Sequence, residues 1–293
     1  MKNILIVGGT GTLGKELVAQ WLEKGEKVHI LTRDPAKNAP LSNLGVIIIK
    51  GDLTDKTSLM SACKGMDAVV SAAHSLMGKG KYASEKVDDT GQKNLIDAAK
   101  EAGIKHFIFT SVIGASENHR ADFWRRKWQI EQYLLASRLN YNIVRASAFM
   151  EFHIAEMLGK SIMTKSKATI FGKGQNPTNF VSVKDVAALM CQLLDTPQYQ
   201  NQIFEIGSPD NPSRLDIVKL YEEKTGKSVK ITHIPNGVLR FMSKLLTPFH
   251  PGLSRVMAVS DLFDRTEQTL DVSPLLKKIP LQLTSVSEFI KHS

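Results

Sequence analysis

The sequence has little cysteine, no long apolar run and no tyrosine-rich or cysteine-rich segment. Its 293 residues include only two cysteines, Cys63 and Cys191, which lie far apart without a CxxC spacing. This spacing speaks against a zinc site and a disulfide framework, so we expect no metal and two buried thiols. No apolar stretch approaches the roughly 20 residues that cross a bilayer, so no transmembrane segment is expected.

Basic charge is plentiful but is not concentrated. The formal net charge is +9, and the Lys and Arg residues are scattered along the chain, which speaks against nucleic-acid binding. A solvated surface that also attracts an anionic ligand accounts for the excess. The apolar run at residues 4–7 is too short for a secretory leader, so we expect a cytoplasmic protein.

Short apolar runs alternate with longer amphipathic segments, a rhythm that predicts βαβ units and a parallel sheet. The runs at residues 4–7 and 46–49 are typical of strands buried on both faces. We expect strands at 3–8, 27–32, 45–50, 68–71, 106–111, 141–145 and 203–206. We expect helices at about 13–23, 59–64, 86–102, 124–137 and 183–194, and one from Ser213 to Gly226 that begins with a capping box.

A glycine-rich loop joins the first predicted strand to the first helix. Gly8, Gly11 and Gly14 stand in the order strand, loop, helix, the context in which this spacing predicts a phosphate site. The first glycine permits a tight turn, the second lets the backbone approach a pyrophosphate, and the third lets helix and strand pack closely. The loop therefore predicts dinucleotide binding at the helix N-terminus. The expected contacts are Gly8, Thr10, Gly11, Thr12, Leu13 and Gly14.

The residues after the second strand bear on which dinucleotide is bound. An Asp or Glu here would bind the ribose hydroxyls of NAD, but the strand ends at Thr32 and is followed by Arg33. Arginine can bind a 2′-phosphate, so we expect NADPH to be favoured over NADH. Two alternatives stay open: Arg33 could be a solvated loop residue, and Asp34 could still bind the ribose hydroxyls of NAD.

The pattern becomes irregular after Arg145, where Gly172, Gly174 and Pro177 break the chain. We therefore predict an α/β fold, a doubly wound parallel sheet of Rossmann type with a smaller C-terminal substrate lobe. We assign residues 1–150 plus about 181–206 to the Rossmann core. The lobe, for a substrate or a partner, is assigned to about 151–180 and 207–293.

These motifs together resemble those of the NmrA-like atypical short-chain dehydrogenases, a family that includes quinone and triphenylmethane reductases. The resemblance covers roughly residues 1–206 and rests on the glycine loop, Arg33 and the segments 51–53, 71–73, 109–111 and 145–151. It implies that Asp52 and Leu53 border the adenine and that Ala72 and Ala73 line the pyrophosphate and ribose. It also implies that Asn94 braces the central helix, although Asn94 could be a surface residue. Asp52 could instead cap the helical segment that follows it.

Catalysis in the wider superfamily runs on a serine, a tyrosine and a lysine in a YxxxK spacing. Here Ser111 ends the fifth predicted strand, Phe123 stands at the tyrosine position, and Lys127 follows four residues later. We expect Lys127, one helical turn from Phe123, to bind the nicotinamide ribose and, with Ser111, to form the catalytic pair. Each has a plainer alternative, a solvated lysine and a strand-end hydrogen bond. His74 could face the nicotinamide but could also be structural.

The resemblance leads to an NADPH-dependent reductase of a small conjugated or aromatic acceptor such as a quinone. The alternative is a non-catalytic NADP(H)-binding sensor or assembly protein that acts through a protein partner, and a nucleotide-sugar epimerase is weaker because the tyrosine is missing. In the lobe, a helix near residues 237–246 would place Leu239, Met242 and Leu246 on one face. That helix could cover a core or a substrate pocket, or rest on an anionic membrane.

Overall fold

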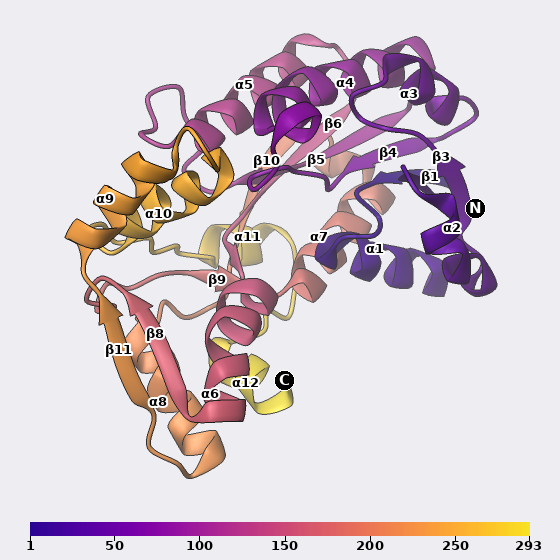
Figure 1. Ribbon diagram of the computed structural model, residues 1–293. Coiled ribbons are helices and arrows are strands. Elements are labelled where there is room, and N and C mark those ends of the chain that lie inside the picture. The colour runs from indigo at the N-terminus through magenta and orange to yellow at the C-terminus, as the bar shows by residue number, and fades with distance from the viewer. The chain divides into compact units, whose positions relative to one another are not determined.

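A seven-stranded parallel sheet with the order β10-β6-β5-β4-β1-β2-β3 forms the centre of the fold (Figure 1). The computed structural model describes residues 1–293 and divides them into two units. Unit 1 comprises Met1–Arg145 and Val186–Phe204, and unit 2 comprises Ala146–Asp185 and Glu205–Ser293. The predicted α/β doubly wound sheet is confirmed. The strands are β1 (Asn3–Val7), β2 (Lys27–Thr32), β3 (Ile47–Lys50), β4 (Ala68–Ser71), β5 (His106–Val112), β6 (Tyr141–Ala146) and β10 (Gln202–Ile206).

Helices cover both faces of this sheet. In Figure 1, α3, α4 and α5 lie on one face and α1 and α7 on the other. The helices and short helical turns of this part are α1 (Thr12–Glu23), α2 (Pro35–Asn38), η1 (Ala39–Leu44), α3 (Lys56–Cys63), η2 (Gly80–Tyr82), η3 (Glu85–Gly91), α4 (Gln92–Glu101), α5 (Asp122–Ala136), α7 (Val183–Asp195) and η5 (Pro197–Tyr199). Strand order reverses between β1 and β4, so the loops that follow these two strands meet at the carboxyl edge of the sheet.

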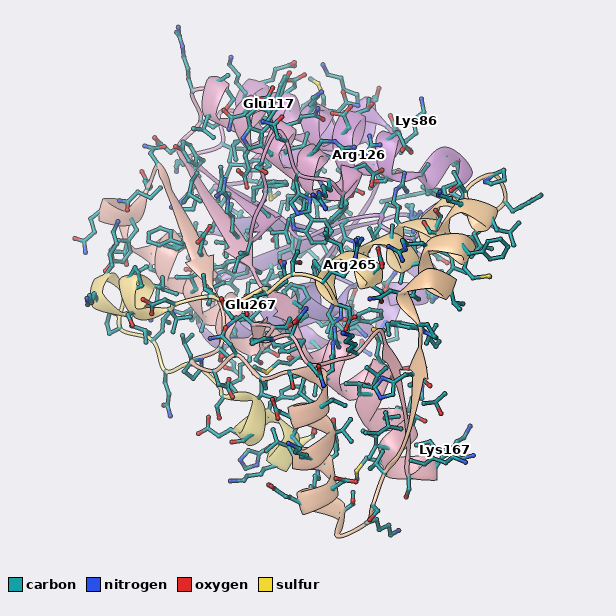
Figure 2. The ribbon with its side chains drawn as sticks, turned by 90° about the vertical axis from the view of Figure 1, so that its left-hand side faces the viewer. Lys86, Glu117, Arg126, Lys167, Arg265 and Glu267 are labelled. Atoms are coloured by element: carbon teal, nitrogen blue, oxygen red, sulfur yellow. The ribbon has the colours of Figure 1, made fainter.

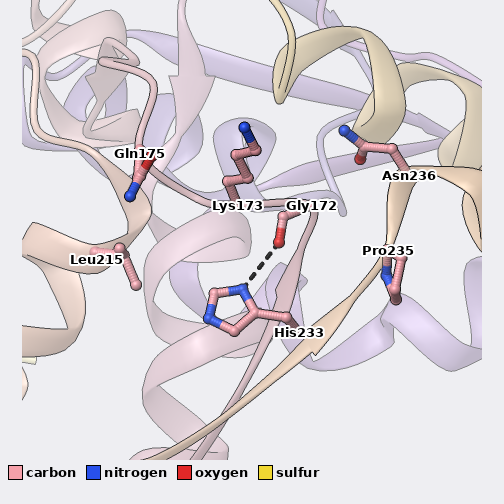
Figure 3. Close-up of a pocket in the computed structure, with 7 residues that line it drawn as sticks. All are labelled: Gly172, Lys173, Gln175, Leu215, His233, Pro235 and Asn236. Atoms are coloured by element: carbon pink, nitrogen blue, oxygen red, sulfur yellow. Dashed lines mark hydrogen bonds between the residues drawn. The ribbon is translucent and has the colours of Figure 1, made fainter.

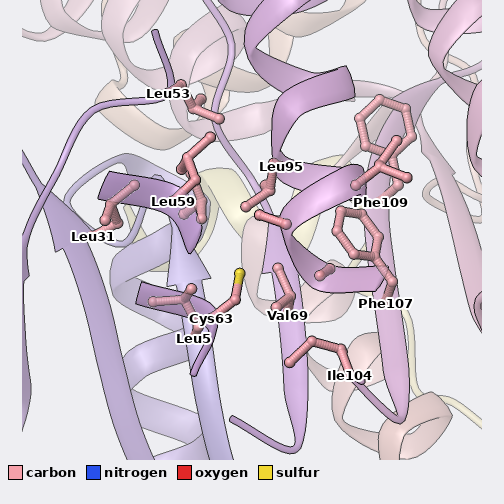
Figure 4. Packing of buried hydrophobic residues seen from close by; sticks show 14 of the residues in the cluster. Leu5, Leu31, Leu53, Leu59, Cys63, Val69, Leu95, Ile104, Phe107 and Phe109 are labelled. Carbon is pink, nitrogen blue, oxygen red and sulfur yellow. The ribbon is translucent and has the colours of Figure 1, made fainter. Parts of the chain in front are cut away.

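The core of unit 1 lies between the sheet and the helices α3, α4 and α5. Figure 4 shows Leu59 and Cys63 of α3 and Leu95 of α4 packed among side chains of the strands, and all three are fully buried. Complete burial of a large apolar side chain such as Phe107 stabilises the fold by about 1.5–3 kcal/mol. Both cysteines are buried as expected, and burial raises the pKa of each thiol to about 12.

Several predicted elements differ by a few residues in their bounds, and two of the differences have a structural cause. The helix expected at 59–64 begins earlier, at Lys56, because the side chain of Asp55 accepts a hydrogen bond from Thr57 N and caps it. The helix expected at 86–102 has two parts: η3 is a π-helical turn and α4 is regular α-helix. Residue propensity does not distinguish these two geometries, and π-helical turns are often found at functional sites.

Unit 2 contains two small parallel sheets and the remaining helices. Strand β7 (Ala148–Phe149) pairs with β9 (Phe180–Val181), and β8 (Lys167–Phe171) pairs with β11 (Lys230–Ile234). The capping box predicted from Ser213 is confirmed at the start of α8, which ends at Gly226 in a left-handed conformation. The helices are η4 (Glu151–Gly159, π-helical), α6 (Lys160–Lys165), α8 (Arg214–Thr225), α9 (Asn236–Leu246), α10 (Pro251–Phe263), α11 (Ser273–Lys278) and α12 (Val286–His292).

Unit 2 has its own core, in which Phe180, Ile217 and Tyr221 are buried. Charged side chains such as Lys86, Glu117 and Lys167 are exposed (Figure 2).

None of the helices has both the length and the apolar character needed to span a membrane. No group of three or more His, Cys, Asp or Glu side chains is gathered in a way that could hold a metal ion.

Candidate functional site: a glycine loop and a buried lysine

The glycine loop packs directly against the segment that follows β4. Gly8 has φ +95°, and a Cβ built on it would lie 2.7 Å from the backbone nitrogen of Ala73. A Cβ on Gly14 would lie 2.1 Å from the carbonyl oxygen of Gly8. Neither position has room for a side chain. The structure thus brings the loop together with Ala72 and Ala73, two more of the predicted cofactor contacts.

Gly11 stands in a different environment from the other two glycines. Its backbone N–H donates to Gly8 O at 3.0 Å, and the only atom within 4 Å of a Cβ built there is Gly8 O, at 3.3 Å. Gly11 is also the N-cap of α1 and offers no capping side chain. The outer side of Gly11 is therefore open, and the N–H groups of the first helical turn have no side-chain partner there. Thr10 and Thr12 beside it are exposed, while the side chain of Leu13 is buried.

Arg33 is exposed beyond the end of β2 and stacks on an aromatic ring. Its guanidinium carbon lies 4.2 Å from the centroid of Tyr82, and Lys81 Nζ lies 4.8 Å from the same centroid. Asp34 caps α2 by accepting a hydrogen bond from Lys37 N at 3.1 Å. Two cations thus surround Tyr82, while the neighbouring carboxylate has a structural partner. Sequence reasoning did not find Tyr82 or Lys81, because no motif marks them.

Asp52 turns out not to cap the helix that follows it. Its carboxylate accepts hydrogen bonds from the backbone and hydroxyl of Thr54, at 2.9 and 3.0 Å, whereas the cap of α3 is Asp55. The capping alternative for Asp52 is therefore wrong, and its contact with an adenine stays a prediction. Leu53 is buried beside Gly91, where a Cβ would lie 3.0 Å from Leu53 O.

The polar side chain that links α4 to the sheet is Gln92. Its Oε1 accepts from Ser71 Oγ at 2.7 Å, and its Nε2 donates to Ala73 O at 3.1 Å. The bracing role expected of Asn94 is therefore held by Gln92, because Asn94 is partly exposed and makes no side-chain hydrogen bond. Gln92 holds the loop after β4 against which Gly8 packs. The signal in the sequence that could have identified Gln92 was a polar side chain at a buried position of the predicted helix.

Lys127 is buried in α5 and reaches the end of β5. Its Nζ donates to Thr110 O at 2.8 Å and lies 4.7 Å from the Phe109 ring centroid and 5.6 Å from that of Phe123. Only 5% of the residue is exposed, so it is not a solvated lysine. Burial lowers the pKa of the ammonium to about 8, although the carboxylates of Asp88 and Glu131 act in the opposite direction.

Ser111 is buried, and its hydroxyl is engaged by a carboxylate. Ser111 Oγ donates to Glu131 Oε1 at 2.5 Å. Glu131 has no exposed surface and forms a two-pronged ion pair with Arg145, at 3.0 Å from Nε and 2.6 Å from Nη2. The sequence analysis included Arg145 only within the segment 145–151, and it did not identify Glu131 as a site residue. The serine proton is therefore already committed to an acceptor.

His74 lies near Phe123, with ring centroids 6.0 Å apart. The surrounding protein lowers the pKa of His74, and the Lys127 ammonium acts in the same direction. Nearby Asp88 is 1% exposed and accepts from Ser75 N at 2.8 Å and Ser84 Oγ at 2.6 Å. Asp88 comes from the π-helical turn η3, so the turn supplies the one carboxylate that influences both His74 and Lys127.

A separate hollow of about 470 Å³ lies within unit 2 (Figure 3). His233 Nδ1 donates to Gly172 O at 2.9 Å, and Asp264 fixes the surrounding loop by accepting from Gly174 N and from Asn236 Nδ2, both at 2.8 Å. None of the predicted site residues lines it. The lining residues are Gly172, Lys173, Gln175, Leu215, His233, Pro235 and Asn236.

The parallel sheet and the glycine loop between β1 and α1 define an α/β protein with a Rossmann-type fold. The chain belongs to the NmrA-like family, whose characteristic sequence it matches over residues 1–290. The match extends well beyond the roughly 206 residues on which the resemblance was first based.

Relatives in sequence include a photosystem II assembly factor and an isoflavone reductase homolog. The chain is 26% identical to the photosystem II assembly factor Ycf39 of Synechocystis over 99% of this chain and 90% of that protein. It is 30% identical to the isoflavone reductase homolog IRL of Zea mays over 99% of this chain and 97% of that protein.

Solved structures confirm the fold. The Escherichia coli NADPH-dependent quinone oxidoreductase QOR2 in complex with NADPH has a TM-score of 0.79 at 20% identity, covering 99% of both chains. The Citrobacter triphenylmethane reductase in complex with NADP(H) has a TM-score of 0.80 at 23% identity, also covering 99% of both chains.

Proposed function

We propose that this chain binds NADPH and reduces a small conjugated or aromatic acceptor, such as a quinone. The observation that carries the proposal is the open side of Gly11 in a loop where Gly8 and Gly14 are closed by backbone contacts. That arrangement leaves a cradle for a phosphate that a side chain at position 11 would begin to fill. The cofactors named for the quinone oxidoreductase and triphenylmethane reductase structures support the same choice.

The cofactor would be held by residues of the glycine loop and by the edge beyond β2. The backbone N–H groups at Thr12 and Leu13 would bind the pyrophosphate, while Ala72 and Ala73 would line its path and Asp52 and Leu53 would border the adenine. Arg33 would bind the 2′-phosphate, and its position over Tyr82 keeps the guanidinium oriented. Asp34 already caps α2, which favours NADPH over NADH.

The chemistry supplied by a bound nicotinamide is hydride donation to the acceptor. Lys127 uses one N–H on Thr110 O and keeps two for a ribose hydroxyl or for the acceptor oxygen. With a pKa near 8, its ammonium can hold or release a proton close to neutral pH. Ser111 donates to Glu131, so it would offer an acceptor only its lone pairs. Phe123 cannot protonate a developing alkoxide.

These roles favour acceptors that do not depend on a strong proton donor. A simple aldehyde that receives hydride becomes a strongly basic alkoxide, whereas a quinone or a cationic aromatic acceptor spreads or cancels the added charge. The test is anaerobic mixing of the protein with NADPH and a panel of quinones, triphenylmethane dyes and aldehydes, followed at the nicotinamide absorbance. Quinones or dyes should react, and aldehydes should react poorly. Efficient turnover of aldehydes by the Lys127→Met variant would contradict this assignment.

A non-catalytic assembly role is the second candidate, favoured by the similarity to photosystem II assembly factors. In that case the chain would bind NADPH and act through a protein partner. The same experiment separates the two functions. Tight NADPH binding with no oxidation in the presence of any acceptor would favour the assembly role, whereas the absence of NADPH binding would contradict both.

A further inference from the structure

Helices α9 and α10 of unit 2 are joined through hydroxyl groups. Ser243 Oγ donates to Ser254 O at 3.0 Å, and Ser254 Oγ donates to Ser243 O at 2.8 Å. Thr247 Oγ1 and Ser254 Oγ lie 2.9 Å apart. Small polar residues therefore form part of the contact between α9 and α10.

The outward side of α9 and the loop after it is apolar. Val238, Phe241 and Leu245 follow one another at spacings of three and four residues, so they lie along one stripe of the helix. Their exposed fractions are 46%, 64% and 50%, and that of Phe249 in the following loop is 78%. We call these four residues the α9 stripe. Large apolar side chains exposed along one stripe of a helix and in the loop after it mark a contact surface.

The charged side chains of α9 itself are all basic. Residues 236–260, which include α9, the following loop and most of α10, contain Arg240, Lys244 and Arg255 and no Asp or Glu. The carboxylate of Asp264 accepts a hydrogen bond from Asn236 at the start of α9. Arg240 and Lys244, one turn apart on α9, are exposed next to the stripe and form no ion pair. An apolar stripe flanked by cations complements the boundary of an anionic bilayer, where acyl chains lie beneath phosphate groups.

We propose that α9 and the loop through Phe249 bind the surface of a membrane that contains anionic lipids. Phe241, Leu245 and Val238 enter the boundary between headgroups and acyl chains, and Arg240 and Lys244 bind lipid phosphates. A second copy of this chain is a poorer occupant, because a symmetric contact would bring Arg240 and Lys244 of one copy against the same cations of the other. This surface function does not depend on the proposed reductase activity.

The test uses the full chain and sedimentation with vesicles. One set of vesicles contains phosphatidylcholine alone, and in the other part of this lipid is replaced by phosphatidylglycerol. The protein should bind only the anionic set, and added salt should weaken binding. Phe241→Ser with Leu245→Ser should reduce binding at least about tenfold. Arg240→Gln with Lys244→Gln should reduce it about fivefold for each charge.

Matched controls change the same kinds of side chain elsewhere. Leu44→Ser with Leu135→Ser removes two exposed apolar residues, and Lys64→Gln with Lys100→Gln removes two exposed charges; neither pair should alter vesicle binding. Thermal unfolding and NADPH titration of every variant separate loss of this surface from loss of the fold or of the cofactor site.

Three results would overturn the proposal. The first is a folded chain that does not bind the anionic vesicles. The second is an equal effect of the control and α9 variants, which would attribute binding to the overall charge of +9. The third is a dimer that the Phe241→Ser and Leu245→Ser changes dissociate while vesicle binding is absent, which would identify a second copy as the occupant.

Discussion

Replacing Gly11 with valine should abolish dinucleotide binding and leave the fold largely intact. The backbone at Gly11 has φ −77°, which valine can adopt, and a Cβ there meets only Gly8 O at 3.3 Å. The cost to stability should therefore stay near 1 kcal/mol, the scale of a changed N-cap. In the bound state the valine would occupy the place of the pyrophosphate. The loss of two charge-assisted hydrogen bonds, at about 1.5–3 kcal/mol each, weakens binding more than about a hundredfold.

The assay is NADPH titration by calorimetry, with urea denaturation of the same samples. Gly14→Ala is the contrasting variant, because its Cβ would lie 2.1 Å from Gly8 O and should destabilise the fold itself by about 1–3 kcal/mol or more. Gly237→Ala is the matched control, since nothing lies within 4 Å of a Cβ there, and it should bind normally. Normal NADPH affinity in Gly11→Val would refute the placement of the site.

Three further predictions concern charged residues. Arg33→Asp should weaken NADPH binding about ten- to a hundredfold and narrow or reverse the preference over NADH; equal affinities in the unaltered protein would remove the claim. Lys127→Met should lower turnover by about a hundredfold. In the unaltered protein kcat/KM should fall as the pH rises through about 8, because deprotonation removes the Lys127 charge that would bind the ribose hydroxyl or the acceptor oxygen; a profile that is flat across pH 8 would contradict this role. Arg145→Met should cost about 3–5 kcal/mol of unfolding free energy in urea, because it leaves the buried Glu131 unpaired, whereas Glu131→Leu combined with Arg145→Met should cost less.

The sheet could be predicted closely because its strands are buried on both faces. The bounds 27–32 and 68–71 agree with β2 and β4, where the apolar runs begin and end at turn residues. The glycine loop was equally readable, because the close approach of Gly14 to Gly8 O is a backbone contact within one βα unit. The packing of Gly8 against Ala73 joins two segments that are distant in sequence, so the glycine spacing alone did not identify that contact.

Contacts between distant segments were not readable in the same way. Gln92 rather than Asn94 links α4 to Ser71 and Ala73, a distinction that depends on the rotation of the helix against the sheet. The Ser111 and Glu131 hydrogen bond joins residues 20 positions apart on different elements. The sequence gives no register between these elements, so the partners could not be chosen from residue type.

The periodicity of helix α9 predicts which residues share a face, but it does not predict which face remains exposed. The sequence places Leu239, Met242 and Leu246 on one face, and in the structure Leu239 is 1% exposed while Met242 and Leu246 are partly buried. Phe241 and Leu245 form a second apolar face, so the helix has more apolar surface than one contact can cover. Hydrogen bonds to α10 decide which face remains outward. An apolar face left exposed after the internal contacts are made is a surface for an occupant from outside the unit, and the exposed cations Arg240 and Lys244 beside it favour an anionic one.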